Sequence, residues 1–270
     1  MHIALTIAGS DSGGGAGIQA DLKTFHQFGI FGTSAITAIT AQNTVGVSAW
    51  QAVPVELVQK QIEAVASDLS PRAVKSGMLA TKEIISVVAG EIRRFELKNY
   101  VLDPVMVATS GDLLIERDAV SAITAELIPL ATVVTPNADE ATVLTGIAIE
   151  SPGDMRRAAE KLMGMGARAV LLKGGHVRTR SGEVVDLLFD GEFSEFTHSR
   201  IETKNTHGTG CTLSAAIAAN LALGLSLHDA VGSSIEFVHE AIATAPDLGS
   251  GHGPLNHFVS SAATNSRTSA

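Results

Sequence analysis

The sequence predicts an α/β fold built on a doubly wound, mostly parallel sheet. The first observation is that short apolar runs alternate with amphipathic segments along most of the chain. The second is composition: aromatic residues make up only 4% of the chain, while small and aliphatic residues are plentiful, which suits helices packed on a parallel sheet. The third is size, because 270 residues allow one large core and no linker or internal repeat divides them.

Six apolar runs of strand length are expected to form buried strands. They are residues 3–8, 33–41, 73–77, 100–103, 132–135 and 169–173. Between them, apolar residues recur at helical spacing over 55–69, 84–95 and 120–127. Repetition of strand, helix and strand implies right-handed crossovers, and these make the strands parallel.

The second half of the chain adds more helices and one hairpin. Ser151 and Pro152 supply a cap and a first-turn proline for a helix that carries Met155 and Leu162. Residues 184–188 and 193–197 predict an antiparallel hairpin at the sheet edge. Further helices are expected over 211–223 and 227–245. We expect residues 1–258 to form a single domain and the small, polar residues 259–270 to be a frayed tail.

Charge and cysteine content exclude several classes of protein. A net charge of -9 and a pI near 5.4 argue against a nucleic-acid partner or an anionic membrane surface. The single cysteine and the absence of a signal sequence favour the cytoplasm. The most apolar helical stretch is shorter than the roughly 18 residues that indicate a membrane span, so no membrane role is expected.

The loops that follow the strands are expected to carry the chemistry, because open α/β sheets bind ligands there. The first loop, within AGSDSGGGAGIQADLKTF, is rich in glycine, so its backbone can approach a ligand closely. A dinucleotide fold would place an acidic residue at the end of the second strand, but none occurs between Asp21 and Glu56. The Walker A motif is also absent, so any nucleotide is held in another way.

Polar side chains follow three later strands. Asp103 lies in LDPVM, Asn137 and Glu140 lie in TPNADE, and Lys173 lies in LLKGGH. These groups suit hydrated Mg²⁺ and phosphate, because Mg²⁺ usually keeps several waters and takes only one or two protein oxygens. The run GTGC at 208–211 then enters a helix, whose free N–H groups and dipole stabilise negative charge on a transferred phosphoryl group.

Seven motifs, in this order, resemble the ribokinase-like superfamily and most closely the hydroxymethylpyrimidine/phosphomethylpyrimidine kinases of bacterial thiamine biosynthesis. The motifs are AGSDSGGGAGIQADLKTF, AQNTVGV, KSGML, LDPVM, TPNADE, LLKGGH and NTHGTGCTLSAA. The resemblance, which runs from residue 3 to residue 258, implies a three-layer α/β/α sandwich and a homodimer. It also implies that MgATP phosphorylates 4-amino-5-hydroxymethyl-2-methylpyrimidine and then its monophosphate.

The same resemblance implies roles for individual residues. The substrate-binding residues that it implies are Gly9, Asp21, Gln42, Met78 and Val105. The ATP-binding residues are Asn137, Lys173, Thr203 and Lys204. The Mg²⁺-binding residues are Asp103 and Glu140. The phosphoryl-transfer residues are Gly208, Thr209, Gly210 and Cys211, whose thiol stands where many relatives carry an aspartate base.

Simpler interpretations of some residues remain open. Cys211 can be a packed thiol, although a helix N-terminus is expected to lower its pKa and leave some thiolate at neutral pH. Asp21 can be a solvated acid near a helix start, and Asn137 and Glu140 can merely cap their helix. The histidines at 176 and 207 are expected to be loop residues, and no spacing of histidine and cysteine indicates zinc.

Two other functions remain as alternatives. The first is a pyridoxal kinase, since pyridoxal is a similar hydroxymethyl-bearing ring. Gln42 favours the aminopyrimidine, because an amide pairs with an exocyclic amine that pyridoxal lacks. The second is a pyrimidine-binding regulator without catalysis, against which the presence of Lys173, Glu140 and Cys211 argues.

Overall fold

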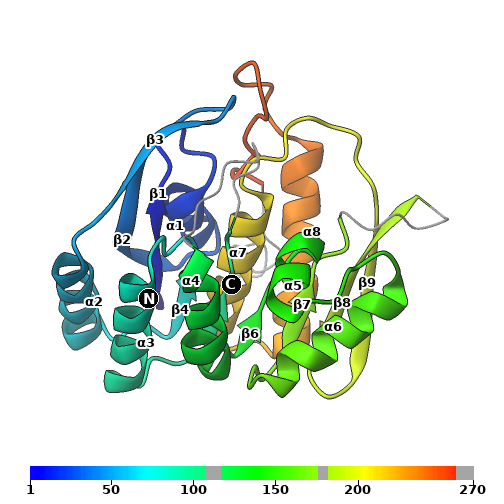
Figure 1. The fold of residues 1–270 in the computed structure, drawn as a ribbon. Coiled ribbons are helices and arrows are strands. Elements are labelled where there is room, and N and C mark those ends of the chain that lie inside the picture. Colours follow the sequence, from blue (N-terminus) through cyan, green and yellow to red (C-terminus); the bar gives the residue numbers. More distant parts are fainter. Residues whose placement is uncertain (107–116, 176–181, 260–270) are drawn as a thin grey trace.

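In the computed structural model, residues 1–106, 117–175 and 182–259 are described, and they contain one nine-stranded sheet. The order of the strands is β3-β2-β1-β4-β5-β6-β7-β8-β9 (Figure 1). Their bounds are β1 Ile3–Ser10, β2 Phe31–Gln42, β3 Val47–Ala52, β4 Ala73–Ser76, β5 Tyr100–Leu102, β6 Val133–Val134, β7 Val170–Leu172, β8 Glu183–Phe189 and β9 Phe193–Ser199. The predicted doubly wound sheet is confirmed.

The sheet is parallel in its centre and antiparallel at both edges. β1, β2 and β4 to β7 run parallel, whereas β3 pairs antiparallel with β2. The predicted hairpin is confirmed as β8 and β9, which lie beyond β7. The chain leaves β1 toward β2 on one side and later returns to β4 on the other side, so the order reverses between β1 and β4. At such a switch point the carboxyl ends of the strands form a crevice.

Helices cover both faces of the sheet and complete the predicted three-layer sandwich (Figure 1). Their bounds are α1 Gly17–Gln27, α2 Val55–Leu69, α3 Lys82–Arg94, α4 Arg117–Ala122, α5 Ala138–Thr145, α6 Pro152–Gly164, α7 Thr209–Leu223 and α8 Leu227–Ala243. The helices α1, α7 and α8 pack together on one face. On the other face, α2 packs on α3 and α3 on α4, and α6 adds to the same core.

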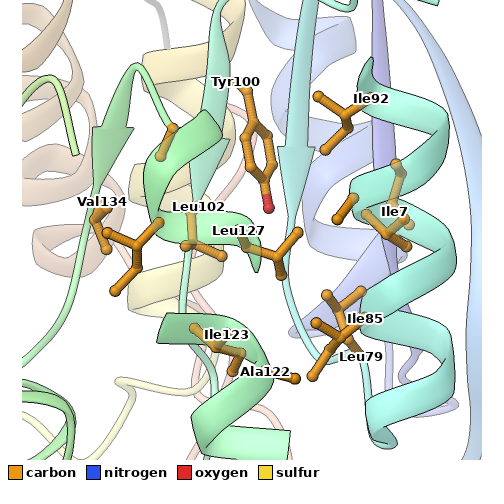
Figure 2. Close-up of a cluster of buried hydrophobic side chains, with 14 of the residues drawn as sticks. Ile7, Leu79, Ile85, Ile92, Tyr100, Leu102, Ala122, Ile123, Leu127 and Val134 are labelled. Atoms are coloured by element: carbon orange, nitrogen blue, oxygen red, sulfur yellow. The ribbon is translucent and has the colours of Figure 1, made fainter. Parts of the chain in front are cut away.

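The two cores follow the period of two expected of buried strands. Leu5, Val74 and Leu102 face the α2–α3–α4 side, and their neighbours Ala73 and Val101 face α7 and α8. Figure 2 shows side chains of α3 and of the segment after α4 meeting Tyr100, Leu102 and Val134 of the sheet. The sheet is therefore held from both sides, which fixes the ends of its strands.

Three features differ from the sequence-based expectation. β3 was not predicted, and its mostly exposed residues lie at the sheet edge. The predicted helix over 120–127 continues from α4 as a π-helix, Ile123–Leu127, and a 3₁₀-helix, Ile128–Leu130, where Pro129 lacks an N–H group. Val259, expected to begin the tail, is buried against the α7–α8 core, and the rest of that tail lies outside the described residues.

None of the helices in the described ranges has the length and apolar composition needed to span a bilayer. The location of the protein in the cell remains a prediction.

Candidate active site

A cavity of about 720 Å³ lies at the carboxyl ends of the central strands, beside the start of α7. The predicted site residues that line it are Gly9, Gln42, Met78, Asp103, Val105, Asn137, Glu140, Lys173, Gly208, Thr209, Gly210 and Cys211. They come from loops far apart in the sequence, which the sheet order brings together. Three predicted residues, Asp21, Thr203 and Lys204, do not line the cavity.

Lys173 joins two carboxylates at one side of the cavity. Its Nζ lies 3.2 Å from Oδ1 of Asp103 and 3.8 Å from Oε2 of Glu140. The hydroxyl of Ser214, in α7, donates to the other oxygen of Asp103 at 3.1 Å. Burial opposes the charge on Lys173, but the two carboxylates outweigh it and hold the pKa of this lysine above its usual range. The result is a cation beside acidic groups, an arrangement that suits phosphate and a divalent metal ion.

Asn137 and Glu140 form a capping box at the start of α5. The side chain of Asn137 accepts from the Glu140 N–H, and Glu140 Oε2 accepts from the Asn137 N–H, both at 2.8 Å. The capping interpretation is therefore confirmed, and both residues also line the cavity. Burial raises the pKa of Glu140 to about 7, and Lys173 only partly offsets this effect. The positive charge near Glu140 is therefore too small to offset the cost of burying its ionised carboxylate.

The start of α7 is built from glycines for steric reasons. Gly208 has φ +84°, and a Cβ there would lie 1.8 Å from the carbonyl oxygen of Gly15. A Cβ on Gly210 would lie 3.1 Å from Nζ of Lys173, so the helix start packs directly against this ammonium group. The first N–H groups of a helix have no acceptor within the helix. Together with Lys173 they form a positive surface for an anion.

Cys211 lies on the cavity wall, but the structure overturns the expected ionisation of its thiol. Burial raises the pKa of Cys211 to about 11; the positive charge of Lys75 acts in the opposite direction, and Asp103 and Asp21 raise the pKa further. The prediction of a thiolate fraction at neutral pH is therefore wrong for the protein without nucleotide. The helix start does not compensate for the loss of water around the sulfur.

Asp21 is fully buried under the cavity floor, so the interpretation of this residue as a solvated acid is wrong. Both of its carboxylate oxygens lie 2.9 Å from Nζ of Lys75, and Thr6 donates to one of them. Lys75 itself lines the cavity, so Asp21 reaches the site only through this lysine. Lys75 was missed by the sequence analysis, although a lysine inside a strand predicted to be buried was the available signal.

Asp11, also missed, organises the glycine-rich loop. Its carboxylate accepts the N–H groups of Gly13, Gly15 and Ala16 at 2.8, 3.0 and 2.8 Å. His207 Nε2 lies 2.9 Å from Oδ2 of the same carboxylate. Burial opposes the charge, but the hydrogen bonds from His207 and the backbone hold the pKa of Asp11 below its usual value. The N–H groups of the loop thus donate to Asp11 within the same loop. His207 was expected to be an ordinary loop residue, but it lines the cavity. His176 lies outside the described residues.

Another part of the cavity wall was not predicted either. It is lined by Val184, Asp186, His198, Ile201, Ile235, Val238 and His239, from β8, β9, α8 and the loop after β9. Asp186 accepts the Gly174 N–H at 2.7 Å and lies 3.4 Å from Nε2 of His198. Lys204, by contrast, is exposed and pairs with Asp247 at 3.2 Å. Thr203 accepts from the Asn205 N–H in the same loop, away from the cavity.

A doubly wound sheet whose strand ends carry a lysine, two carboxylates and a glycine-lined helix start defines a kinase that acts on small molecules. The chain belongs to the phosphomethylpyrimidine kinase family, whose model matches residues 11–256. It is 55% identical to the hydroxymethylpyrimidine/phosphomethylpyrimidine kinase of Rhizobium meliloti over 260 residues, which cover 95% of this chain and 97% of that protein.

Solved structures of related kinases have the same fold. The phosphomethylpyrimidine kinase of Clostridium difficile has a TM-score of 0.80 and 45% identity, and the match covers 90% of this chain and 100% of that one. The pyridoxal kinase of Staphylococcus aureus, in complex with AMP-PCP and pyridoxal, has a TM-score of 0.88 and 37% identity, and the match covers 95% and 93%. The ribokinase-like fold class and the kinase assignment are thereby confirmed.

Proposed function

We propose that this chain uses ATP to phosphorylate 4-amino-5-hydroxymethyl-2-methylpyrimidine and then its monophosphate. The observation that carries the proposal is that one cavity joins Gln42 and Met78 at one side to Lys173 and the start of α7 at the other. The first side suits a small heteroaromatic ring, because it offers an amide and an apolar thioether surface. The second side suits the phosphates of a nucleotide.

In this proposal the ring lies between Gly9, Met78 and Val105, and Gln42 pairs with its aminopyrimidine edge. Met78 Sδ lies 3.1 Å from where a Cβ on Gly9 would be, so the glycine lets the sulfur pack directly on the end of β1 at the cavity wall. Lys75, held by Asp21, places a positive charge in the floor below. This charge would stabilise the negative charge that develops on the oxygen of the hydroxymethyl group when its proton leaves.

Mg²⁺ is proposed to be held by Asp103 and Glu140 together with the phosphates of ATP. The donor set fits, because Mg²⁺ commonly binds one or two carboxylates and keeps water and phosphate oxygens. Glu140 also fits because its carboxylate lies buried with too little positive charge nearby, as its pKa of about 7 indicates. Bound there, Mg²⁺ would supply positive charge to the phosphates, while Lys173 and the N–H groups at the start of α7 stabilise the transferred phosphoryl group.

Cys211 is proposed to face the acceptor oxygen. Because its thiol is protonated at neutral pH, it would first lose its own proton to water, and the thiolate would then accept the proton of the alcohol late in the transfer, when the loose transition state has already made the alcohol acidic. The monophosphate needs less help, since its second pKa near 6 leaves the nucleophile largely ionised at neutral pH.

A pyridoxal kinase is the second candidate, and it is favoured by the solved pyridoxal kinases of the same fold. The aminopyrimidine kinase is preferred because the sequence relatives that carry that name are more similar, at 55% identity against 37%. Purified protein with MgATP should be offered each alcohol separately, with Lys173→Met as the inactive control. A larger kcat/KM for pyridoxal would reverse the assignment, and turnover of neither alcohol would leave only a binding role.

A homodimer is proposed at the β2–β3 edge. Ile39 and Trp50 are 59% and 38% exposed there, and Val45 in the connecting turn is 64% exposed. Large apolar side chains gathered at one edge are typical of an interface, because a monomer gains nothing from leaving them in water. Analytical ultracentrifugation of the protein measures this state directly.

A further inference from the structure

A chain of hydrogen bonds links the glycine-rich loop to Gln42. Asp11 lies 2.9 Å from Nε2 of His207, and the same Nε2 lies 3.3 Å from the Nε2 position of Gln42. At the other end of the carboxamide, Oγ1 of Thr40 lies 3.3 Å from the Oε1 position of Gln42. Thr40 also donates to the carbonyl oxygen of Ser10 at 2.8 Å. Both ends of the carboxamide therefore have a polar neighbour.

The hydrogens in this chain are determined by Asp11. Its carboxylate already accepts three backbone N–H groups, and its pKa is low, so it acts only as an acceptor. The Nε2 atom of His207 must then carry a hydrogen. At the other end, Thr40 has one hydrogen, which goes to Ser10, so its oxygen is left as an acceptor for Gln42.

These assignments decide the orientation of the carboxamide. With the amide nitrogen beside His207, two N–H donors would face each other, and the amide oxygen would face the lone pairs of Thr40. Rotating the group by half a turn removes both conflicts, because its oxygen then shares the Nε2 hydrogen of His207 with the closer Asp11, and its nitrogen donates to Thr40. The nitrogen and oxygen of a carboxamide have similar sizes, so the hydrogen-bond network decides between the two orientations.

We propose that Asp11, His207 and Thr40 are positioning residues that hold the carboxamide of Gln42 in one orientation and thereby determine which ring edge the cavity accepts. One hydrogen on the nitrogen and one lone pair on the oxygen remain for a ligand. The amide then offers a donor and an acceptor in a fixed order. An aminopyrimidine edge, with an amine donor beside a ring-nitrogen acceptor, matches this order in one orientation only.

The inference rests on the proposed function for the identity of the ring. It adds that selectivity comes from residues behind Gln42 as well as from Gln42 itself. A site built to pair with a substrate N–H group rejects an analogue that lacks it, because its own polar groups are left unpaired. If the amide could turn freely, it could adapt to pyridoxal, and this rejection would weaken.

The orientation itself can be observed in the wild-type protein by NMR with ¹⁵N-labelled glutamine. Nuclear Overhauser contacts from the Gln42 amide hydrogens to the side chain of Thr40 are expected. Contacts from these hydrogens to the ring of His207 instead would overturn the proposal. This measurement needs no variant and no turnover, so it stands whether or not the proposed substrate is correct.

Kinetics test the consequence. His207→Phe keeps a ring of similar size but loses the Nε2 donor, whereas His207→Gln can still donate toward Asp11 and Gln42. We expect His207→Phe to raise KM for the aminopyrimidine alcohol about tenfold, as the loss of one ordinary hydrogen bond would, with kcat within about threefold. KM for pyridoxal should fall or stay the same, because a freely turning amide can adapt to that ring, and His207→Gln should restore the aminopyrimidine KM. The exposed His26, changed to glutamine, is the matched control.

The outcomes separate this inference from the proposed function. A wild-type protein that fails to phosphorylate the aminopyrimidine refutes the function. A wild-type protein that does phosphorylate it, with a selectivity unchanged in His207→Phe, refutes the positioning role. An equal fall in kcat for both alcohols, with both KM values unchanged, also overturns it, because that result indicates a role in phosphoryl transfer or in loop packing. Should His207→Phe not fold, Thr40→Val is expected to raise the same KM from the other end of the amide, with Thr40→Ser as its rescue.

Discussion

Replacing Glu140 by glutamine should stabilise the protein without nucleotide while abolishing most of its activity. Glutamine keeps the oxygen that accepts from the Asn137 N–H, so the start of α5 retains its cap. What it removes is a buried negative charge, whose cost appears as a pKa raised from 4.5 to about 7. Lys173 keeps Asp103 as its partner at 3.2 Å. The ionised side chain of Glu140, which is proposed to bind Mg²⁺, therefore lowers the stability of the protein without metal and nucleotide.

The size and pH dependence of this effect follow from the shift in pKa. Between pH 4.5 and 7 the folded protein retains a proton that the unfolded chain releases, so the wild type loses stability as the pH rises through this window. The full shift corresponds to about 3 kcal/mol, reached near pH 8, and to less than about 1 kcal/mol at pH 5. Glu140→Gln lacks this dependence. At pH 8 its melting temperature should exceed that of the wild type by roughly 5 to 10 °C.

Urea or thermal unfolding at pH 5 and pH 8, with a chelator present and no nucleotide, measures the difference. The exposed Glu150, changed to glutamine, is the matched control and should change nothing at either pH. An equal gain at both pH values would mean that packing, and not charge, is responsible. No gain at pH 8 would show that Glu140 is already compensated, and the argument that it awaits a cation would fail. Added Mg²⁺ with ATP should narrow the gap between wild type and variant.

Three further predictions concern the site and the assembly. Lys173→Met should lower kcat by about 10² to 10³, as the loss of one transition-state donor does in other enzymes, in a coupled ADP-release assay; a change confined to KM would assign the lysine to binding alone. Cys211→Ala should impair phosphorylation of the alcohol more than that of the monophosphate, and equal losses with the two substrates would contradict a proton-accepting role. Ile39→Glu and Trp50→Glu, each made as a single variant, should convert the proposed dimer to a monomer in sedimentation. If both variants sediment like the wild type, the interface lies elsewhere.

Much of the fold could be predicted because its signals are local. The strand at 73–77 follows from a short apolar run and the helix at 84–95 from apolar residues at a period of about 3.6, signals that each segment carries within itself. The hairpin of β8 and β9 follows from a turn between two alternating runs. β3 escaped prediction, since an exposed edge strand depends on its neighbour for its conformation and carries little pattern of its own.

The candidate site divides in the same way. Lys173 and Glu140 could be proposed because polar groups directly after apolar strands fall at the ligand-binding edge of an open sheet. Asp11, 196 positions before His207 in the chain, could not be paired with it from sequence, since only the sheet order and the packing of α7 on the first loop bring the two together. Lys75 was visible only as an anomaly, a charge within a strand predicted to be buried.

The sequence by itself determined the layered α/β architecture, the edge at which ligands bind and the family to which the chain belongs, because periodicity and motif order are properties of contiguous residues. The tertiary structure alone decided the burial of Asp21 with Lys75, the raised pKa values of Cys211 and Glu140, and the Asp11–His207–Gln42 chain. Burial, charge balance and hydrogen-bond direction depend on which distant groups surround an atom, and that is settled only when the strands take their places in the sheet.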